Sequence, residues 1–104
     1  MLKTLLVSND WMTWGDHGLY NGYVVLPEGH PHHGADYNNI PVDVHYGLTY
    51  ASADYPSQYG GEKGTNNEWI VGFDTNHLGD SPQKWTKEAV QIETDNLRKQ
   101  LESL

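Results

Sequence analysis

Short apolar segments alternate along the chain with stretches rich in Gly, Pro, Asn and Asp. Three segments are almost continuously apolar, and we expect each to form a β-strand: residues 2–8, 22–26 and 68–74. The last segment has few polar positions, which is typical of a strand in the middle of a sheet. Gly72 within it is consistent with a β-bulge.

A fourth segment, residues 42–50, alternates in polarity and also predicts a strand. One expected face is apolar and comprises Val42, Val44, Tyr46, Leu48 and Tyr50. The opposite face carries Asp43, His45 and Thr49. We expect the apolar face to meet the core and the polar face to present its carboxylate and imidazole to a ligand.

Two long connections separate these strands, and both are rich in residues that favour loops. Residues 28–41 are rich in Gly, Pro, Asn and His, and residues 51–67 in Tyr, Gly, Ser and Asn. Loops of this length in so small a chain are usually functional, so we expect both to serve a binding site.

The pair Ser81-Pro82 predicts the start of a C-terminal helix over residues 82 to about 103, with Ser as N-cap and Pro at the first position. Its apolar residues form two stripes about 120° apart. The stripes are Trp85, Ala89 and Ile92, and Val90, Leu97, Leu101 and Leu104. We expect the first to pack on the sheet and the second, with spacings of seven, to pair with another subunit. The alternative is that the helix rotates its contact across one core.

Together these elements predict a single α+β domain over residues 1–104. It has a small sheet of about four strands, two long loops and one C-terminal helix packed on the sheet. A chain of 104 residues has room for one modest core. We expect a homo-oligomer formed through the C-terminal helix.

The charge is unevenly distributed and excludes some partners. The formal net charge is −8, from 6 basic and 14 acidic residues. Four of each sign lie from residue 81 onward, so residues 1–80 hold two basic and ten acidic side chains. Such a surface repels the backbone of DNA and RNA, and it favours a cation or a ligand with a positive part.

The composition also limits the site chemistry and the expected location. The chain has no Cys, which excludes disulfides and thiolate zinc sites. No segment approaches the roughly 20 apolar residues of a membrane helix, so no membrane partner is expected. We expect a cytoplasmic protein, located in the host cell if the source is viral.

Histidines and aspartates gather at the ends of the expected strands, next to glycines. We expect six residues to bind a ligand: Asp43, His45, Tyr46, Trp69, Asp74 and His77. The Asp and His side chains would orient a small molecule, and Tyr46 or Trp69 would stack on it. Glycine-rich turns supply backbone N–H groups that hold a phosphate without net positive charge.

His and Asp are also metal ligands, so the sequence indicates a divalent metal as its one candidate cofactor. Further candidate ligands are His30, His32, His33 and Asp80. A mixed imidazole and carboxylate shell suits zinc, manganese or iron. None of these spacings is a metal signature, and the alternative for His30 and His32 is a solvated loop. Neither a nucleophile motif nor a phosphate-binding loop is present, so we assign no catalytic residues.

The block from Trp69 to Asp80, followed by Trp85, Val90, Glu93 and Leu97, resembles a segment of small uncharacterised phage and prophage proteins. The segments 23–30 and 43–47 are similar to the same group, and the resemblance covers about residues 20–100. In size and in pocket residues, such proteins resemble viral proteins that sequester nucleotide immune signals. Those viral proteins are small, α+β and oligomeric. This chain lacks the Arg and Lys clusters that those pockets often use.

The resemblance and the pocket residues lead to one functional prediction and two alternatives. The prediction is a phage-type counter-defence protein that binds and sequesters a small nucleotide-derived immune signal without turnover. The first alternative is a metal-dependent phosphodiesterase or other hydrolase that uses the same Asp and His residues. The second is an acidic protein-binding inhibitor that docks on a host enzyme.

Overall fold

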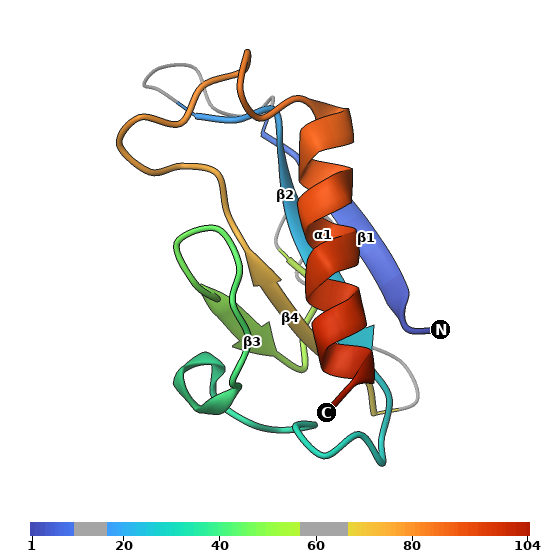
Figure 1. The fold of residues 1–104 in the computed structure, drawn as a ribbon. Coiled ribbons are helices and arrows are strands. Elements are labelled where there is room, and N and C mark those ends of the chain that lie inside the picture. Colours follow the sequence, from blue (N-terminus) through green and yellow to red (C-terminus); the bar gives the residue numbers. More distant parts are fainter. Residues whose placement is uncertain (10–16, 57–66) are drawn as a thin grey trace.

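A four-stranded antiparallel sheet covered on one face by one helix forms the fold (Figure 1). The computed structural model describes residues 1–9, 17–56 and 67–104. Its elements are β1 (Lys3–Ser8), β2 (Tyr20–Leu26), a short 3-10 helix (Tyr37–Asn39), β3 (Tyr50–Ser52), β4 (Trp69–Phe73) and α1 (Lys87–Glu102). The strand order is β1-β2-β4-β3, so β4 is central as predicted. The α+β architecture is confirmed.

The two central strands are buried on both faces, which explains their nearly continuous apolar sequences. On the helix side, one core cluster joins the sheet to α1 through residues that include Val24, Leu26, Val71, Phe73, Val90, Leu97 and Leu101. On the opposite side, a second cluster comprises Val7, Tyr23, Val25 and Ile70. Among the described residues, no helix is long and apolar enough to cross a membrane.

Helix α1 begins five residues later than the sequence predicted. Thr86 is the N-cap, and its side chain accepts a hydrogen bond from the Ala89 N–H at 3.2 Å. Ser81 instead starts a separate turn, in which its carbonyl accepts from the Trp85 N–H at 2.9 Å. The Leu19 N–H donates to the Trp85 carbonyl at 2.9 Å. This contact ties the end of the turn to the segment before β2, and the helix starts only after it.

The predicted roles of the two helix stripes were wrong. Val90, Leu97 and Leu101 are fully buried against the sheet, whereas Ile92 is 65% exposed. Because the helix starts late, Trp85 lies outside it. Only Ala89 and Ile92 of the first stripe remain in the helix, and they offer less apolar area to bury than the second stripe does. Three of the four residues expected to pair subunits are thus used within one chain, and the fourth, Leu104, is 42% exposed. Self-association stays a prediction, without the stripe on which it depended.

The expected strand over residues 42–50 is mostly a loop. The chain reverses in a turn closed by a hydrogen bond from the Gly47 N–H to the Val44 carbonyl at 2.7 Å. Tyr46 and Gly47 both have positive φ, 56° and 78°, which breaks the period-2 alternation. Val44 is buried as predicted, but Tyr46 is 65% exposed and not in the core.

The two expected loops also differ in their boundaries. The first, residues 28–41, contains the 3-10 helix. The start of the second is wrong, because Ala51 and Ser52 belong to β3. Residues 57–66 of that loop lie outside the described residues.

Gly72 is not a bulge. It pairs in regular register with Tyr23 on one side and Tyr50 on the other. A Cβ atom at this position would lie 2.1 Å from Tyr23 Cδ2 and 2.6 Å from the Gly22 carbonyl oxygen. Glycine is required here because the Tyr23 ring occupies the space above the strand.

A buried amide network fixes the chain that follows β4. Asn9 and Asn21 exchange two side-chain hydrogen bonds of 3.0 Å each. Asn21 Oδ1 also accepts from the Thr75 N–H at 3.0 Å, and the Thr75 hydroxyl donates to the Tyr20 carbonyl at 2.7 Å. Asn9, Asn21 and Thr75 are all buried. This network holds the start of the β4–α1 connection against the ends of β1 and β2.

We predict that Tyr23 makes stability sensitive to alkaline pH. Burial raises the pKa of Tyr23 from 10.0 to about 12, so the folded state holds this proton more tightly than the unfolded state does. The stabilisation is complete below pH 10 and is lost as the pH rises toward 12, by about 2–3 kcal/mol. Chemical denaturation at several pH values measures this change.

The control is Tyr23→Phe, which has no hydroxyl to ionise. Its free energy of unfolding should fall less than that of the wild type between pH 10 and pH 12. Parallel curves for the two proteins would show that Tyr23 contributes nothing to the alkaline sensitivity.

Candidate functional site

A cluster of His and Asp side chains forms where two loops meet. The turn before β3 rises toward the connection between β4 and α1 (Figure 1). Asp80, from the second loop, is 3% exposed. Its Oδ1 accepts from His45 Nε2 at 2.8 Å, and its Oδ2 accepts from the His77 backbone N–H at 2.9 Å. The buried carboxylate thereby joins both loops.

Hydrogen bonding keeps the Asp80 carboxyl ionised despite its burial. Burial alone would raise the pKa of Asp80. The His77 backbone N–H and the side chains of His45 and His77 oppose this effect and hold the pKa below its usual value. The site therefore contains a fixed, buried negative charge at neutral pH.

His77 lies between two carboxylates. Its Nδ1 is 3.2 Å from Asp80 Oδ2, and its Nε2 is 3.4 Å from Asp74 Oδ1. A neutral imidazole has one N–H and can donate to only one of these carboxylates. The other ring nitrogen then faces a carboxylate without a proton between them. That contact becomes favourable only if this nitrogen also carries a proton or binds a metal ion. Asp74 also accepts from the Asn76 N–H at 3.1 Å, which fixes its carboxylate locally.

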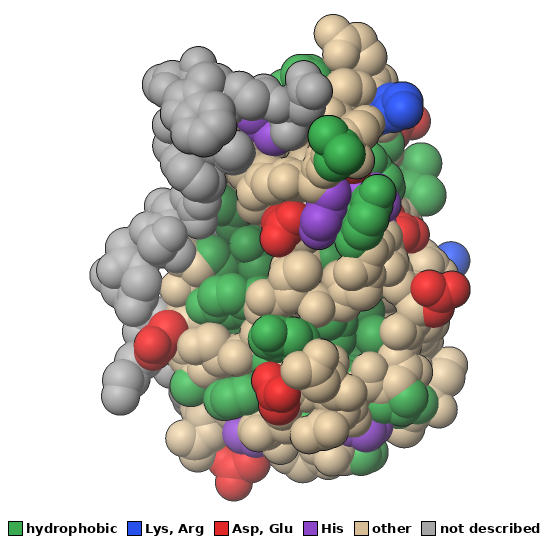
Figure 2. Space-filling view, turned by 90° about the vertical axis from the view of Figure 1, so that its left-hand side faces the viewer, with side chains coloured by type: hydrophobic (Ala, Val, Ile, Leu, Met, Phe, Trp, Pro, Cys, Tyr) green, Lys and Arg blue, Asp and Glu red, His purple; other side chains and the backbone are tan. Residues whose placement is uncertain are grey.

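Aromatic rings and a third carboxylate complete the cluster. The Tyr46 ring stacks on His77 with centroids 4.2 Å apart and planes 12° apart. Trp85 packs against His45 at 4.3 Å. The His45 backbone N–H donates to Glu93 Oε2 of α1 at 2.9 Å. In Figure 2 a histidine lies at the surface between a carboxylate and hydrophobic side chains.

Tyr46 has an unfavourable backbone conformation. Its φ of 56° lies in the left-handed region, where turns usually place Gly or Asn. For a bulky residue this conformation costs about 1–2 kcal/mol. The side chain is nevertheless 65% exposed, so burial of its ring offsets little of that cost. A strained and exposed aromatic residue is typical of a functional site.

The cluster has the composition of a transition-metal site. His45, His77 and Asp80 each offer one ligand atom, and these three atoms lie within 4.8 Å of one another. Four of the six predicted ligand-binding residues, His45, Tyr46, Asp74 and His77, meet here, together with the metal candidate Asp80. The contributions of Trp85 and Glu93 were missed, because neither has a sequence spacing that relates it to His45.

Asp43 and Trp69 lie apart from this cluster. Asp43 is exposed, and its backbone N–H and carbonyl both bond the Gln100 side chain at 2.7 Å. Trp69 is at the opposite end of β4 from Asp74, and its Nε1 donates to the Ala35 carbonyl at 3.0 Å. Their predicted roles beside His45 and His77 are therefore not supported by position.

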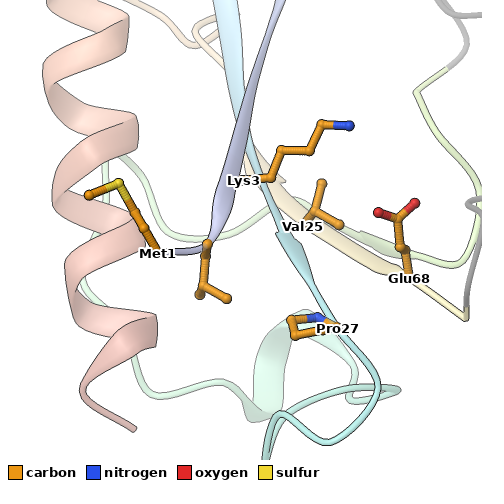
Figure 3. A pocket seen from close by; sticks show the side chains of 6 residues that line it. Met1, Lys3, Val25, Pro27 and Glu68 are labelled. Atoms are coloured by element: carbon orange, nitrogen blue, oxygen red, sulfur yellow. The ribbon is translucent and has the colours of Figure 1, made fainter.

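Two concave regions of the described surface lie away from the cluster. Trp69 and His33 line one cavity of 410 Å³. Another, of 290 Å³, lies at the strand ends, where Lys3 and Glu68 flank Val25 (Figure 3). The imidazole side chains of the cluster are partly exposed, 17% for His45 and 23% for His77.

The three histidines of residues 30–33 also lie elsewhere. His30 Nε2 donates to the Leu101 carbonyl at 2.8 Å, and its Nδ1 accepts from the His32 N–H at 3.1 Å. His30 therefore caps the last turn of α1, and both of its nitrogens are engaged. His33 Nε2 contacts the Asn67 carbonyl. None of the three joins the group formed by His45, His77 and Asp80.

Comparison with known proteins adds no family to these observations. The chain matches no protein-family model, no curated protein and no solved structure. The resemblance to phage proteins stays a prediction from the sequence, and the function must be argued from the cluster itself.

We predict that Asp80→Asn destabilises the fold by about 1–3 kcal/mol at pH 7, because buried donors lose a charged acceptor. The deficit should shrink as the pH falls below about 3.8. The wild-type carboxylate, whose pKa is depressed when folded, contributes its stability above that pH and loses it on protonation. Urea denaturation between pH 2.5 and pH 7 measures both effects.

Asp43→Asn is the matched control, because the Asp43 side chain is exposed and makes no hydrogen bond among the described residues. It should stay within about 0.5 kcal/mol of the wild type. An equal loss in both variants would mean that net charge, and not the Asp80 contacts, sets the stability.

Proposed function

We propose that the protein binds a divalent transition-metal ion, best matched by zinc, through His45, His77 and Asp80, and that the ion holds a small anionic ligand. The observation that carries the proposal is the convergence of two imidazoles and one carboxylate within 4.8 Å. Two His and one carboxylate form a common set of protein ligands in zinc sites with an open position.

The distances support this assignment. Zinc ligands at about 2.0–2.2 Å in a tetrahedron are about 3.3 Å from one another. The Asp80 carboxylate already contacts both imidazoles: its Oδ1 is 2.8 Å from His45 Nε2, and its Oδ2 is 3.2 Å from His77 Nδ1. Because the three ligand atoms lie within 4.8 Å of one another, shifts of about 1.5 Å or less would bring them to this spacing.

The proton positions also fit a bound ion. With zinc on His77 Nδ1, the single proton of a neutral imidazole would lie on Nε2, which is 3.4 Å from Asp74 Oδ1. A carboxylate that accepts from a metal-bound imidazole is a common second layer around zinc. The His77 backbone N–H holds Asp80 Oδ2, which leaves Oδ1 for the ion. The ion thus takes the place of two protons, at His45 Nε2 and at His77 Nδ1.

The local charge favours a cation and explains how an acidic protein would hold an anion. Asp74, Asp80 and Glu93 surround the two imidazoles, and among the described residues none of the three pairs with a Lys or with Arg98. A divalent ion would offset this charge and provide open coordination positions for a phosphate or carboxylate. Direct binding of an anion without the ion is unfavourable here.

A metal-dependent hydrolase is the second candidate, because three protein ligands leave a position for an activated water. Capture without turnover is our first choice, since no Lys or Arg of the described chain contacts the cluster to stabilise charge in a transition state. The nucleotide-derived immune signal, the phage origin and the acidic enzyme inhibitor stay predictions from the sequence.

We predict that the metal-free protein binds one equivalent of Zn²⁺, and that His45→Ala or His77→Ala weakens binding at least tenfold. Asp74→Ala should weaken it about 10–100-fold, because it removes the acceptor that orients His77. Isothermal titration measures affinity, and the visible absorption of the Co²⁺-loaded protein reports a tetrahedral site.

His32→Ala is the matched control, because the His32 ring makes no hydrogen bond within the described part of the chain. It should bind Zn²⁺ as the wild type does. Equal loss in His32→Ala and His77→Ala, or no zinc binding by the wild type, would contradict the proposal.

A second experiment separates capture from hydrolysis. The zinc-loaded wild type is incubated with bis(4-nitrophenyl) phosphate and, separately, with a nucleoside monophosphate. Capture predicts a bound anion that is recovered unchanged after denaturation. Product release that a chelator stops and that His77→Ala abolishes would favour the hydrolase.

A further inference from the structure

We infer that Tyr46 is the specificity-determining residue of this site and selects ligands in which a planar ring carries a phosphate or carboxylate. The anionic group would bind the metal ion, and the ring would stack on the free face of Tyr46. The inference rests on the proposed metal site and deepens it by naming the class of ligand.

The first argument is the strain at Tyr46. The turn from Val44 to Gly47 needs a left-handed residue at its third position, and Gly or Asn would supply one without strain. A tyrosine here stores strain in the loop. Strain of this kind persists where the side chain has a role other than stability.

The second argument is the position of the ring. One face stacks on His77 at 4.2 Å, and the ring of His45 meets it edge-on, with centroids 4.8 Å apart and planes at 87°. These contacts fix the ring, yet the residue is 65% exposed. The outer face is therefore presented to solvent in a defined orientation, next to both imidazole ligands. A rigid aromatic face of this kind is a stacking platform for another ring.

The third argument is the combination of surfaces around the ring. Leu78, which follows His77 in the chain, is an apolar residue that is 93% exposed. The carboxylates of Asp74 and Asp80 contact the two ring nitrogens of His77, at 3.4 Å and 3.2 Å. A ligand that uses both surfaces needs an apolar planar part for Tyr46 and an anionic part for the ion. Nucleoside monophosphates and aromatic carboxylates have this form.

The test compares three probes on the zinc-loaded protein: adenosine 5′-monophosphate, ribose 5-phosphate, which lacks the ring, and adenosine, which lacks the anion. We expect the monophosphate to bind at least tenfold more tightly than either of the others. Tyr46→Gly should weaken binding of the monophosphate at least tenfold and leave ribose 5-phosphate unchanged. Tyr46→Phe should bind as the wild type does. Isothermal titration supplies all of these affinities.

A thermal unfolding series separates a ligand-binding role from a structural one. Glycine relieves the left-handed strain, so Tyr46→Gly should melt at the wild-type temperature or above it. A lower melting temperature, together with equal weakening of both phosphate probes, would overturn the inference and make the ring a packing element. Equal affinities of the wild type for the monophosphate and ribose 5-phosphate would overturn it too.

The two proposals fail in different ways. Zinc is titrated first into the wild type, Tyr46→Gly and Tyr46→Phe, and all three should bind one equivalent with similar affinity. Loss of zinc binding in the wild type would contradict the metal site. Intact zinc binding without discrimination between the probes would contradict only the role of Tyr46.

Discussion

Buried polar groups at one end of the sheet need partners, and this constraint determines the rest of the site. Asp80 is the clearest case, because its carboxylate is 3% exposed and carries a charge. An isolated buried charge would be very costly, so its donors must be held in place. Those donors come from His45 and His77, on two loops without regular structure. The carboxylate therefore orders both loops through a few short hydrogen bonds.

The buried amide network of Asn9, Asn21 and Thr75 positions the part of the β4–α1 connection that precedes His77 and Asp80. Asn21 Oδ1 accepts from the Thr75 N–H, which sets where the chain leaves β4. His77 and Asp80 follow within a few residues, so the network places them over the end of the sheet. Among the described residues no buried side-chain polar atom lacks a partner. The cluster is thus hydrogen-bonded without an ion, and under our proposal an ion would replace the protons that now lie between the imidazoles and Asp80.

Strands with a continuously apolar sequence were predictable from the sequence. The face of α1 that packs on the sheet was not, because two apolar stripes of the helix could have been buried. The strands β1, β2 and β4 lie within two residues of the expected bounds. The sheet-facing stripe of α1 was misassigned, because Trp85 reads as helical until its carbonyl is seen to bond Leu19. Once Trp85 is excluded, the larger stripe through Val90 and Leu97 has more apolar area to bury, and it turns to the sheet.

The site was predictable in residue type but not in assembly. The sequence predicted Asp43, His45, Asp74 and His77 as ligand-binding residues and Asp80 as a metal candidate; the structure brings His45, Asp74, His77 and Asp80 together and places Asp43 apart, against Gln100. Tyr46 was expected in the core, because alternation assumes an extended backbone and local propensity disfavours a tyrosine at positive φ. Because Tyr46 has a positive φ, the alternation expected of an extended strand does not predict which way its side chain points. Such exceptions collect at functional positions, which supports the proposed role of Tyr46 in ligand binding.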